Sequence, residues 1–211
     1  MTTGNAAEPG LRERKRRATR RAIQLAVLDL VAERGLEGVT VDEVSRIADV
    51  SPRTFFNYFS SKEEAVLGDS PELPASEYIE AFVADDRPLL ESLGRLFVSV
   101  GEQSLLDVEM VRRRHVLLKQ YPHLFAMRMA TMRKFEEEMV GVIAQRLARD
   151  EPALAANPEA LAQKAHLVTL VTFAAMRHAW TNWAGGESTS LLSERLAESF
   201  RDLRQIFGLP H

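Results

Sequence analysis

Residues 40–64 read TVDEVSRIADVSPRTFFNYFSSKEE, a stretch with three helix starts around one tight turn. Thr40 and Glu43 match a capping box, in which the threonine hydroxyl accepts from a first-turn amide and the glutamate reaches back to the amide of the cap. The helical pattern then stops. Ser51 and Pro52 restart it, with a hydroxyl at the cap and a residue that needs no amide hydrogen. Two short helices joined so tightly predict a helix-turn-helix.

The second helix of this pair is expected to span residues 52–59, because a third capped start, Ser61-x-x-Glu64, follows directly. On a helical wheel of about 100° per residue, aromatic residues fall on one face and polar residues on the other. The aromatic face, expected to be the anchor, carries Phe55 and Phe59. The polar face, left free to read DNA, carries Arg53, Thr54 and Asn57.

The chain has 211 residues, 45% hydrophobic and 27% charged, as is ordinary for a globular protein. It has no cysteine, which excludes disulfides, thiolate metal sites and thiol nucleophiles. No segment approaches about eighteen uninterrupted apolar residues, and no apolar core follows the basic N-terminal segment as in a secretory signal. We therefore expect a cytoplasmic protein that does not associate with membranes.

Charge is distributed unevenly along the chain. Residues 1–62 carry 11 Lys and Arg against 8 Asp and Glu, whereas residues 63–211 carry 16 against 22. Only the N-terminal part suits a polyanion. A basic run just before the helix-turn-helix is expected to contact phosphates or the minor groove, although many such runs are only solvated faces. Its members are Arg12, Arg14, Lys15, Arg16, Arg17, Arg20 and Arg21.

Every long segment has helical periodicity and none alternates, so the expected fold is all-α. Residues 1–13 are expected to be a disordered tail, residues 14–67 a three-helix DNA-binding domain, and residues 75–211 a larger helical domain, with GDSPELP at the junction. The core expected for the first domain consists of Ile23, Val27, Leu30, Val44, Ile47, Phe55 and Phe59. Helices are expected over residues 14–34, 62–67, 75–84, 88–103, 108–119, 122–149, 158–183 and 188–207.

Large, deformable apolar residues recur on the helices of the second domain. They fit an ordinary core, and they equally fit an apolar effector cavity, since methionines line adaptable surfaces and pockets form between helices of a bundle. The candidate lining residues are Phe97, Met110, Phe125, Met129, Met132, Phe173, Met176 and Trp180. Arg114 is added because three consecutive arginines spread over roughly 200° of a helix, so that one can face inward toward an anionic group.

The helix expected over residues 158–183 is apolar on more than one face and must be covered twice. With the closing helix it is expected to form half of a four-helix dimer interface; burial within one subunit is the alternative. The five histidines form no HExxH motif, and neither a Gly-rich phosphate loop nor a GxSxG motif is present. We therefore expect no metal, no cofactor and no enzymatic activity.

Residues 14–67 resemble the TetR family of one-component bacterial transcription regulators. Besides the basic helix and the Thr-x-x-Glu cap, the resemblance rests on Ile47-Ala48, Val50-Ser51, Thr54-Phe55, Tyr58-Phe59 and Ser61-Lys62-Glu63. Beyond Leu67 it covers only the all-helical layout. It implies a homodimer that reads a palindromic operator in double-stranded DNA, dimerises through its last two helices, and binds a small-molecule effector that spreads the DNA-reading heads.

The resemblance also implies which residues face the duplex: Ser51, Arg53, Thr54, Asn57 and Tyr58. Lys62, at a helix N-terminus, would meet phosphate, and Thr40 would lie near the backbone. Many relatives have tyrosine where this chain has Phe56, which lacks the hydroxyl donor but keeps a ring for a thymine methyl. Arg53 and Asn57 are the best base readers by chemistry, because arginine bonds guanine bidentately and asparagine bonds adenine.

The leading hypothesis is an operator-binding repressor released by a small, largely apolar effector. Two alternatives stay open. One is a small helical enzyme or carrier of apolar molecules, for which salt-dependent binding of a DNA palindrome is not expected. The other is an architectural DNA-binding protein without an effector, which predicts little preference for an operator over random duplex.

Overall fold

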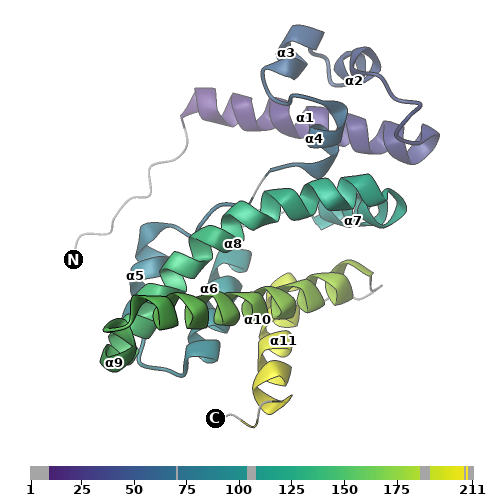
Figure 1. Ribbon diagram of the computed structural model, residues 1–211. Coiled ribbons are helices and arrows are strands. Elements are labelled where there is room, and N and C mark those ends of the chain that lie inside the picture. Colours follow the sequence, from purple (N-terminus) through teal and green to yellow (C-terminus); the bar gives the residue numbers. More distant parts are fainter. Residues whose placement is uncertain (1–9, 70, 104–107, 186–190, 207, 209–211) are drawn as a thin grey trace. The chain divides into compact units, whose positions relative to one another are not determined.

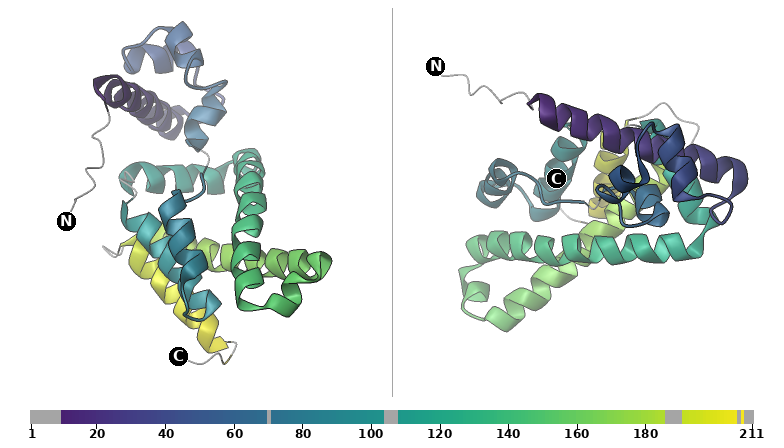
Figure 2. Two further views of the ribbon diagram at one scale, coloured as in Figure 1. Left: turned by 90° about the vertical axis from the view of Figure 1, so that its left-hand side faces the viewer. Right: turned by 90° about the horizontal axis from the view of Figure 1, so that it is seen from above.

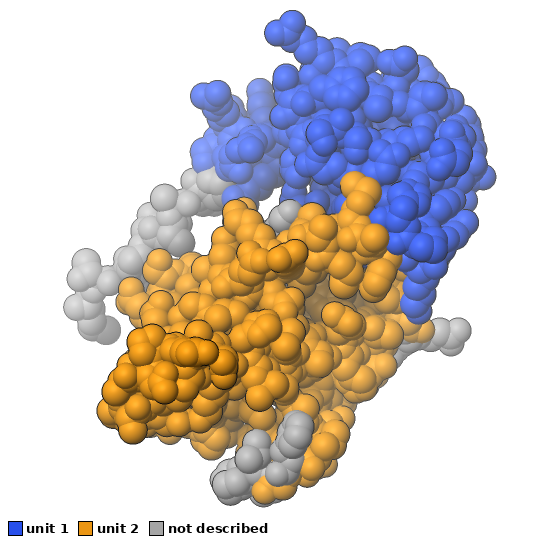
Figure 3. All heavy atoms as spheres, in the orientation of Figure 1, with its two compact units in different colours: residues 1–69, 116–124 blue, residues 70–115, 125–211 orange. Residues whose placement is uncertain are grey.

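The computed structural model describes residues 10–69, 71–103, 108–185, 191–206 and 208. Every regular element in these ranges is a helix, which confirms the predicted all-α fold (Figure 1). The chain forms two compact units, coloured separately in Figure 3. The first unit contains residues 1–69 and 116–124, and the second contains residues 70–115 and 125–211.

The helices are α1 (Leu11–Arg34), α2 (Val41–Ile47), α3 (Pro52–Phe56), α4 (Lys62–Leu67), α5 (Ser76–Ala84), α6 (Leu89–Gln103), α7 (Val108–Gln120), α8 (Pro122–Asp150), α9 (Pro152–Ala155), α10 (Pro158–Gly185) and α11 (Leu192–Ile206). The short α9, with proline at its first position, was not expected. The predicted tail is too long, because α1 begins at Leu11; residues 1–9 lie outside the described residues.

The first unit is built on α1, which packs against α2 and α4. The predicted core residues of α1, Ile23, Val27 and Leu30, are buried, and so is Ala26 beside them. Val44 of α2 and the two anchoring rings, Phe55 and Phe59, are also buried, as predicted. Ile47 was predicted to be buried and is 49% exposed. It is the last residue of a seven-residue helix whose buried residues are Val44 and Ser45, so the buried face ends one turn before the helix does.

Local hydrogen bonds account for the turn between α2 and α3. Asp49 has a φ of 55°, a left-handed conformation that aspartate tolerates better than most residues. The amide of Val50 donates to the carbonyl of Ser45 at 2.9 Å, the long bond of a Schellman ending. The Ser51 hydroxyl then accepts from the amide of Thr54 at 3.0 Å and starts α3. These bonds confirm the helix-turn-helix.

The α3 helix is shorter than the predicted 52–59. It ends at Phe56, and the amide of Asn57 is shared between the carbonyls of Arg53 and Thr54. The last turn is therefore tightened, as at many helix ends. Phe59 remains in place because its amide donates to Phe55 at 3.0 Å and its ring lies 6.0 Å from that of Phe55, centroid to centroid.

The second unit buries one large apolar cluster, to which α5, α6, α8, α10 and α11 contribute. Two views in Figure 2 show α11 running beside α6, and α11 also packs against α10. Within the described ranges no helix is long and apolar enough to cross a membrane.

A buried arginine holds one end of this unit together. Arg146 of α8 is only 1% exposed. Its guanidinium donates to the carbonyl of Phe82 at 2.8 Å, to the carbonyl of Arg87 at 2.6 Å and to the carboxylate of Asp150 at 2.6 Å. It therefore supplies the short hydrogen bonds to backbone groups where α5 leads into α6. The other donors to these carbonyls are longer: the amide of Asp85 lies 3.4 Å from the carbonyl oxygen of Phe82, and the Ser92 hydroxyl lies 3.4 Å from that of Arg87.

Replacing this arginine should destabilise the protein strongly. Arg146→Ala removes the short hydrogen bonds to two carbonyls and one carboxylate and leaves them only longer contacts. Breaking such a buried network costs about 3–5 kcal/mol. The exposed Arg133, which pairs with Glu137 one turn away, is the matched control, and Arg133→Ala should cost less than about 0.5 kcal/mol. Urea unfolding followed by circular dichroism measures both. Similar free energies of unfolding for the two variants would contradict the assigned role of Arg146.

Candidate nucleic-acid interface

The α3 helix presents a mixed polar and aromatic surface. Arg53 and Asn57 are exposed, as the helical wheel predicted, and Phe56 is 56% exposed. The opposite side is fixed, since Phe55 is fully buried and holds the Phe56 ring edge-on at a centroid distance of 5.4 Å. The helix thus offers a guanidinium, an amide and an apolar ring from a rigid base, a set that can read base edges and a thymine methyl.

The residues at the helix starts that were predicted to contact DNA act as helix caps in the structure. Ser51 accepts from an amide of α3, and its hydroxyl lies 2.8 Å from that of Thr54. Thr40 accepts from the amide of Glu43 at 3.3 Å, while the carboxylate of Glu43 accepts from the amide of Thr40 at 3.1 Å. The capping box is therefore confirmed. Thr40 and Ser51 are both exposed residues, so their roles as caps do not remove them from the surface.

Hydrogen bonds at two helix caps also lower the pKa of a glutamate carboxyl group. Hydrogen bonds from the Thr40 side chain and amide, helped by Arg34, hold the pKa of Glu43 below its ordinary value. The Ser60 hydroxyl likewise holds the pKa of Glu64 down despite partial burial. The second of these caps differs from prediction: the Glu64 carboxylate accepts from the amide of Ser60 at 2.6 Å, one residue before Ser61, which was expected to be its partner.

Arg20, predicted to bind DNA, has partners within the first unit, and its DNA contact stays a prediction. Its guanidinium donates to the carbonyl of Tyr58 at 2.9 Å and to the carboxylate of Asp69 at 2.5 Å. It also lies over the ring of Phe59, 4.2 Å from the centroid. These three contacts direct the charge into the first unit. Tyr58, predicted to face DNA, is half-buried.

Arg16 and Arg17 remain available at the surface. Each side chain is 67% exposed and pairs with Glu13 on the same helix, at 3.8 and 3.1 Å. Exposed pairs of this kind are weak, so a phosphate can replace the glutamate at little cost.

Lys62 has a different environment from the one expected. Its ammonium donates to the carbonyl of Leu36 at 2.7 Å and to that of Val39 at 2.9 Å. Two of its three donors therefore hold the loop between α1 and α2. Lys62 joins α4 to this loop, and its predicted phosphate contact can use only the remaining donor.

A residue that the sequence analysis did not select binds the same loop. Tyr121, between α7 and α8, belongs to the first unit, and its hydroxyl accepts from the amide of Leu36 at 3.1 Å. Gly35 has a φ of 75°, and a Cβ at that position would lie 3.3 Å from the tyrosine oxygen. No sequence motif marks Tyr121, because its partner is 85 residues away.

The predicted effector residues are mostly core residues of the second unit. Phe97 and Phe173 are buried in the large cluster, where Met132 and Met176 pack against it. Met110 is buried, Met129 is half-buried, and Trp180 packs on a smaller cluster around Trp183. Phe125 is 48% exposed, which does not fit the lining of an enclosed cavity. Neither of the two hollows described in this unit is lined by any of the nine predicted residues.

Two of the three consecutive arginines on α7 turn inward. The guanidinium of Arg112 lies over the ring of Trp183, 5.6 Å from the centroid, and its Nε is buried. Nη2 of Arg114 is buried as well. One inward arginine was expected on this helix, and two have a buried guanidinium nitrogen. They lie on the same helix as Val111, which belongs to the smaller apolar cluster.

Comparisons with known proteins bear on this interface. Residues 26–67 match the sequence profile of the bacterial regulatory proteins of the tetR family. The HTH-type transcriptional regulator TcmR of Streptomyces glaucescens is 33% identical over 154 residues, which cover 65% of this chain and 64% of TcmR. The chain thus spans less than two thirds of the length of this curated relative.

Two crystal structures of NalD, the secondary repressor of the MexAB-OprM multidrug efflux pump in Pseudomonas aeruginosa, share the fold. One superposes with a TM-score of 0.56 at 20% identity over 90% of this chain and 96% of NalD. The other, of native NalD, has a TM-score of 0.54 at 21% identity over 88% and 96%. The profile match and the helix-turn-helix identify residues 26–67 as a DNA-binding domain of the tetR type. The NalD structures show that the chain as a whole shares their all-helical fold.

Proposed function

We propose that this protein is a homodimeric repressor that binds a palindromic operator and is released by a small-molecule effector. The observation that carries the proposal is the outward face of α3, where Arg53, Phe56 and Asn57 are exposed on a helix anchored by a buried phenylalanine. We assign base reading to Arg53 and Asn57, and phosphate contact to Thr40, Ser51, Thr54 and the exposed arginines of α1.

Effector control needs a ligand that binds the released state better than the DNA-bound state. We place the effector in the second unit, near the buried arginine nitrogens of α7 and the cluster around Trp183, a setting suited to an apolar molecule with an anionic group. The α7 and α8 helices both continue into the corner at Tyr121, which belongs to the first unit. A shift of either helix would act on the α1–α2 loop through the tyrosine hydroxyl.

The proposed dimer uses α10 and α11. These helices pack against each other, and α10 carries Leu167 and Leu170, which are 61% and 44% exposed. The two leucines are one turn apart, and the other side of the helix is buried. They form an apolar surface that a second copy of the chain can cover.

Arg53→Ala should relax sequence preference. Loss of a bidentate arginine–guanine contact costs about 1–3 kcal/mol of discrimination, so the ratio of operator to random-DNA affinity should fall about 5- to 150-fold. Arg53→Lys keeps the charge but not the fork and should lose a similar preference. Electrophoretic mobility shifts on a selected operator and on random duplex give the ratio. Equal losses on both DNAs would make Arg53 a phosphate contact.

Tyr121→Phe should loosen the α1–α2 loop without disturbing the core. Loss of one hydrogen bond of about 0.5–1.5 kcal/mol should speed exchange of the Leu36 amide about 2- to 10-fold. Tyr78→Phe in the second unit is the matched control and should leave this amide unchanged. Hydrogen exchange followed by NMR measures the rate. Unchanged protection of Leu36 in Tyr121→Phe would show that the tyrosine does not hold the loop.

The paired substitution Leu167→Glu and Leu170→Glu should dissociate the proposed dimer, because it places two charges on each copy against an apolar surface. Sedimentation equilibrium should show monomers, and affinity for a full palindrome should approach that for a half-site. Val116→Glu, at a residue 59% exposed in the first unit, is the control and should remain dimeric. A stable dimer of the double variant would place the interface elsewhere.

A further inference from the structure

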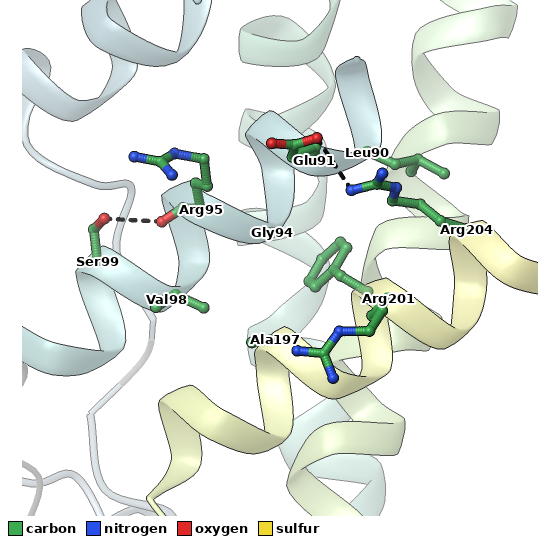
Figure 4. A pocket seen from close by; sticks show the side chains of 10 residues that line it. Leu90, Glu91, Gly94, Arg95, Val98, Ser99, Ala197, Arg201 and Arg204 are labelled. Carbon is green, nitrogen blue, oxygen red and sulfur yellow. Dashed lines mark hydrogen bonds and ion pairs between the residues drawn. The ribbon is translucent and has the colours of Figure 1, made fainter. Parts of the chain in front are cut away.

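A groove lies between α6 and α11 in the second unit, with a volume of about 380 Å³ (Figure 4). This volume is within the range of sites for small molecules, about 300–1,000 Å³. None of the predicted effector residues lines it, and none of its lining residues belongs to the DNA-binding unit. The groove is therefore distinct from the effector position and from the DNA-reading surface proposed above.

The apolar part of the groove is a fixed surface. Leu90, Val98, Ala197 and Phe200 line it, together with Gly94. A Cβ on Gly94 would lie 3.1 Å from the Cβ and Cγ of Phe200, so the glycine allows the two helices to approach closely.

The charged part of the groove has an excess of cations. Arg204 donates to the carboxylate of Glu91 at 3.1 Å, and the two charges offset each other across the helices. Arg95 and Arg201 also line the groove, are exposed, and extend from α6 and α11 in Figure 4. Among the described residues, neither guanidinium forms a hydrogen bond or an ion pair. Two positive charges thus remain uncompensated beside an apolar surface.

We propose that this groove binds a small aromatic carboxylate. The aromatic body would lie against Phe200, Val98 and Ala197, where ring contacts are favourable. The carboxylate would accept from Arg95 or Arg201, since a guanidinium fork matches a carboxylate bidentately and also packs well on aromatic faces. A fully polar anion such as free phosphate would leave the apolar surface uncovered.

A matched pair of ligands tests the proposal. The probes are 2-naphthoate and the neutral 2-naphthamide, which have nearly the same shape but differ in charge. In titrations followed by NMR of the ligand, the carboxylate should bind the full-length protein at least about tenfold more tightly than the amide, and added salt should narrow this difference. Equal affinities, or no binding of 2-naphthoate, would overturn the proposal.

Variants locate the binding to this groove. The double variant Arg95→Ala, Arg201→Ala should lose the preference for the carboxylate, whereas Arg133→Ala, at an exposed arginine of α8, should keep it. Ala197→Phe should fill the groove and weaken both ligands. Thermal unfolding confirms that each variant is folded, and operator binding should be unaffected by the double variant. A carboxylate preference that survives in the double variant would place binding outside the groove, whatever the outcome of the operator experiments.

Discussion

The first unit depends on how the loop after α1 satisfies its backbone. Gly35 turns the chain out of the helix with a positive φ, and the peptide groups that follow have no helical partners. Buried peptide groups need partners, and here both sides of Leu36 receive one: Lys62 donates to its carbonyl and Tyr121 accepts from its amide. One short loop therefore fixes the end of α1, the start of α4 and the corner between α7 and α8. A lysine with two carbonyls in reach has little freedom left to follow a DNA phosphate.

The elements of this unit that depend on local contacts could be predicted from the sequence. The caps at Thr40 and Ser51 join residues three apart, and such bonds are visible as spacing. The sequence did not predict contacts in which a side chain has a distant partner. Arg20 belongs to a basic run that reads as a DNA-binding face, yet its guanidinium bonds Asp69, 49 residues away. Charge and periodicity are the same for an arginine that meets phosphate and for one that closes the fold.

The second unit shows a similar limit for apolar residues. Periodicity identifies an apolar face but not the element that covers it, so it cannot distinguish a core from a cavity wall. Phe97 and Phe173 were candidates for an effector site and lie in the packed cluster, whereas Phe125 is half exposed. The groove between α6 and α11 was not predicted, because its lining residues are far apart in the sequence. Arg95 and Arg201, which line it, are 106 positions apart in the sequence, and Gly94 allows the two helices that carry them to approach closely.

The exposed aromatic ring on α3 also supports a role for this helix in DNA binding. The Phe56 ring is 56% exposed and therefore contributes little hydrophobic stabilisation to the folded unit. Phe55 beside it is fully buried. A single exposed apolar residue needs no explanation in general. This one, however, shares a rigid helix with an exposed guanidinium and an exposed amide, and its ring is held edge-on by its neighbour. Such a set matches the major groove, where methyl groups lie next to hydrogen-bonding base edges. The aromatic position thus supports the same reading of α3 as the polar ones do.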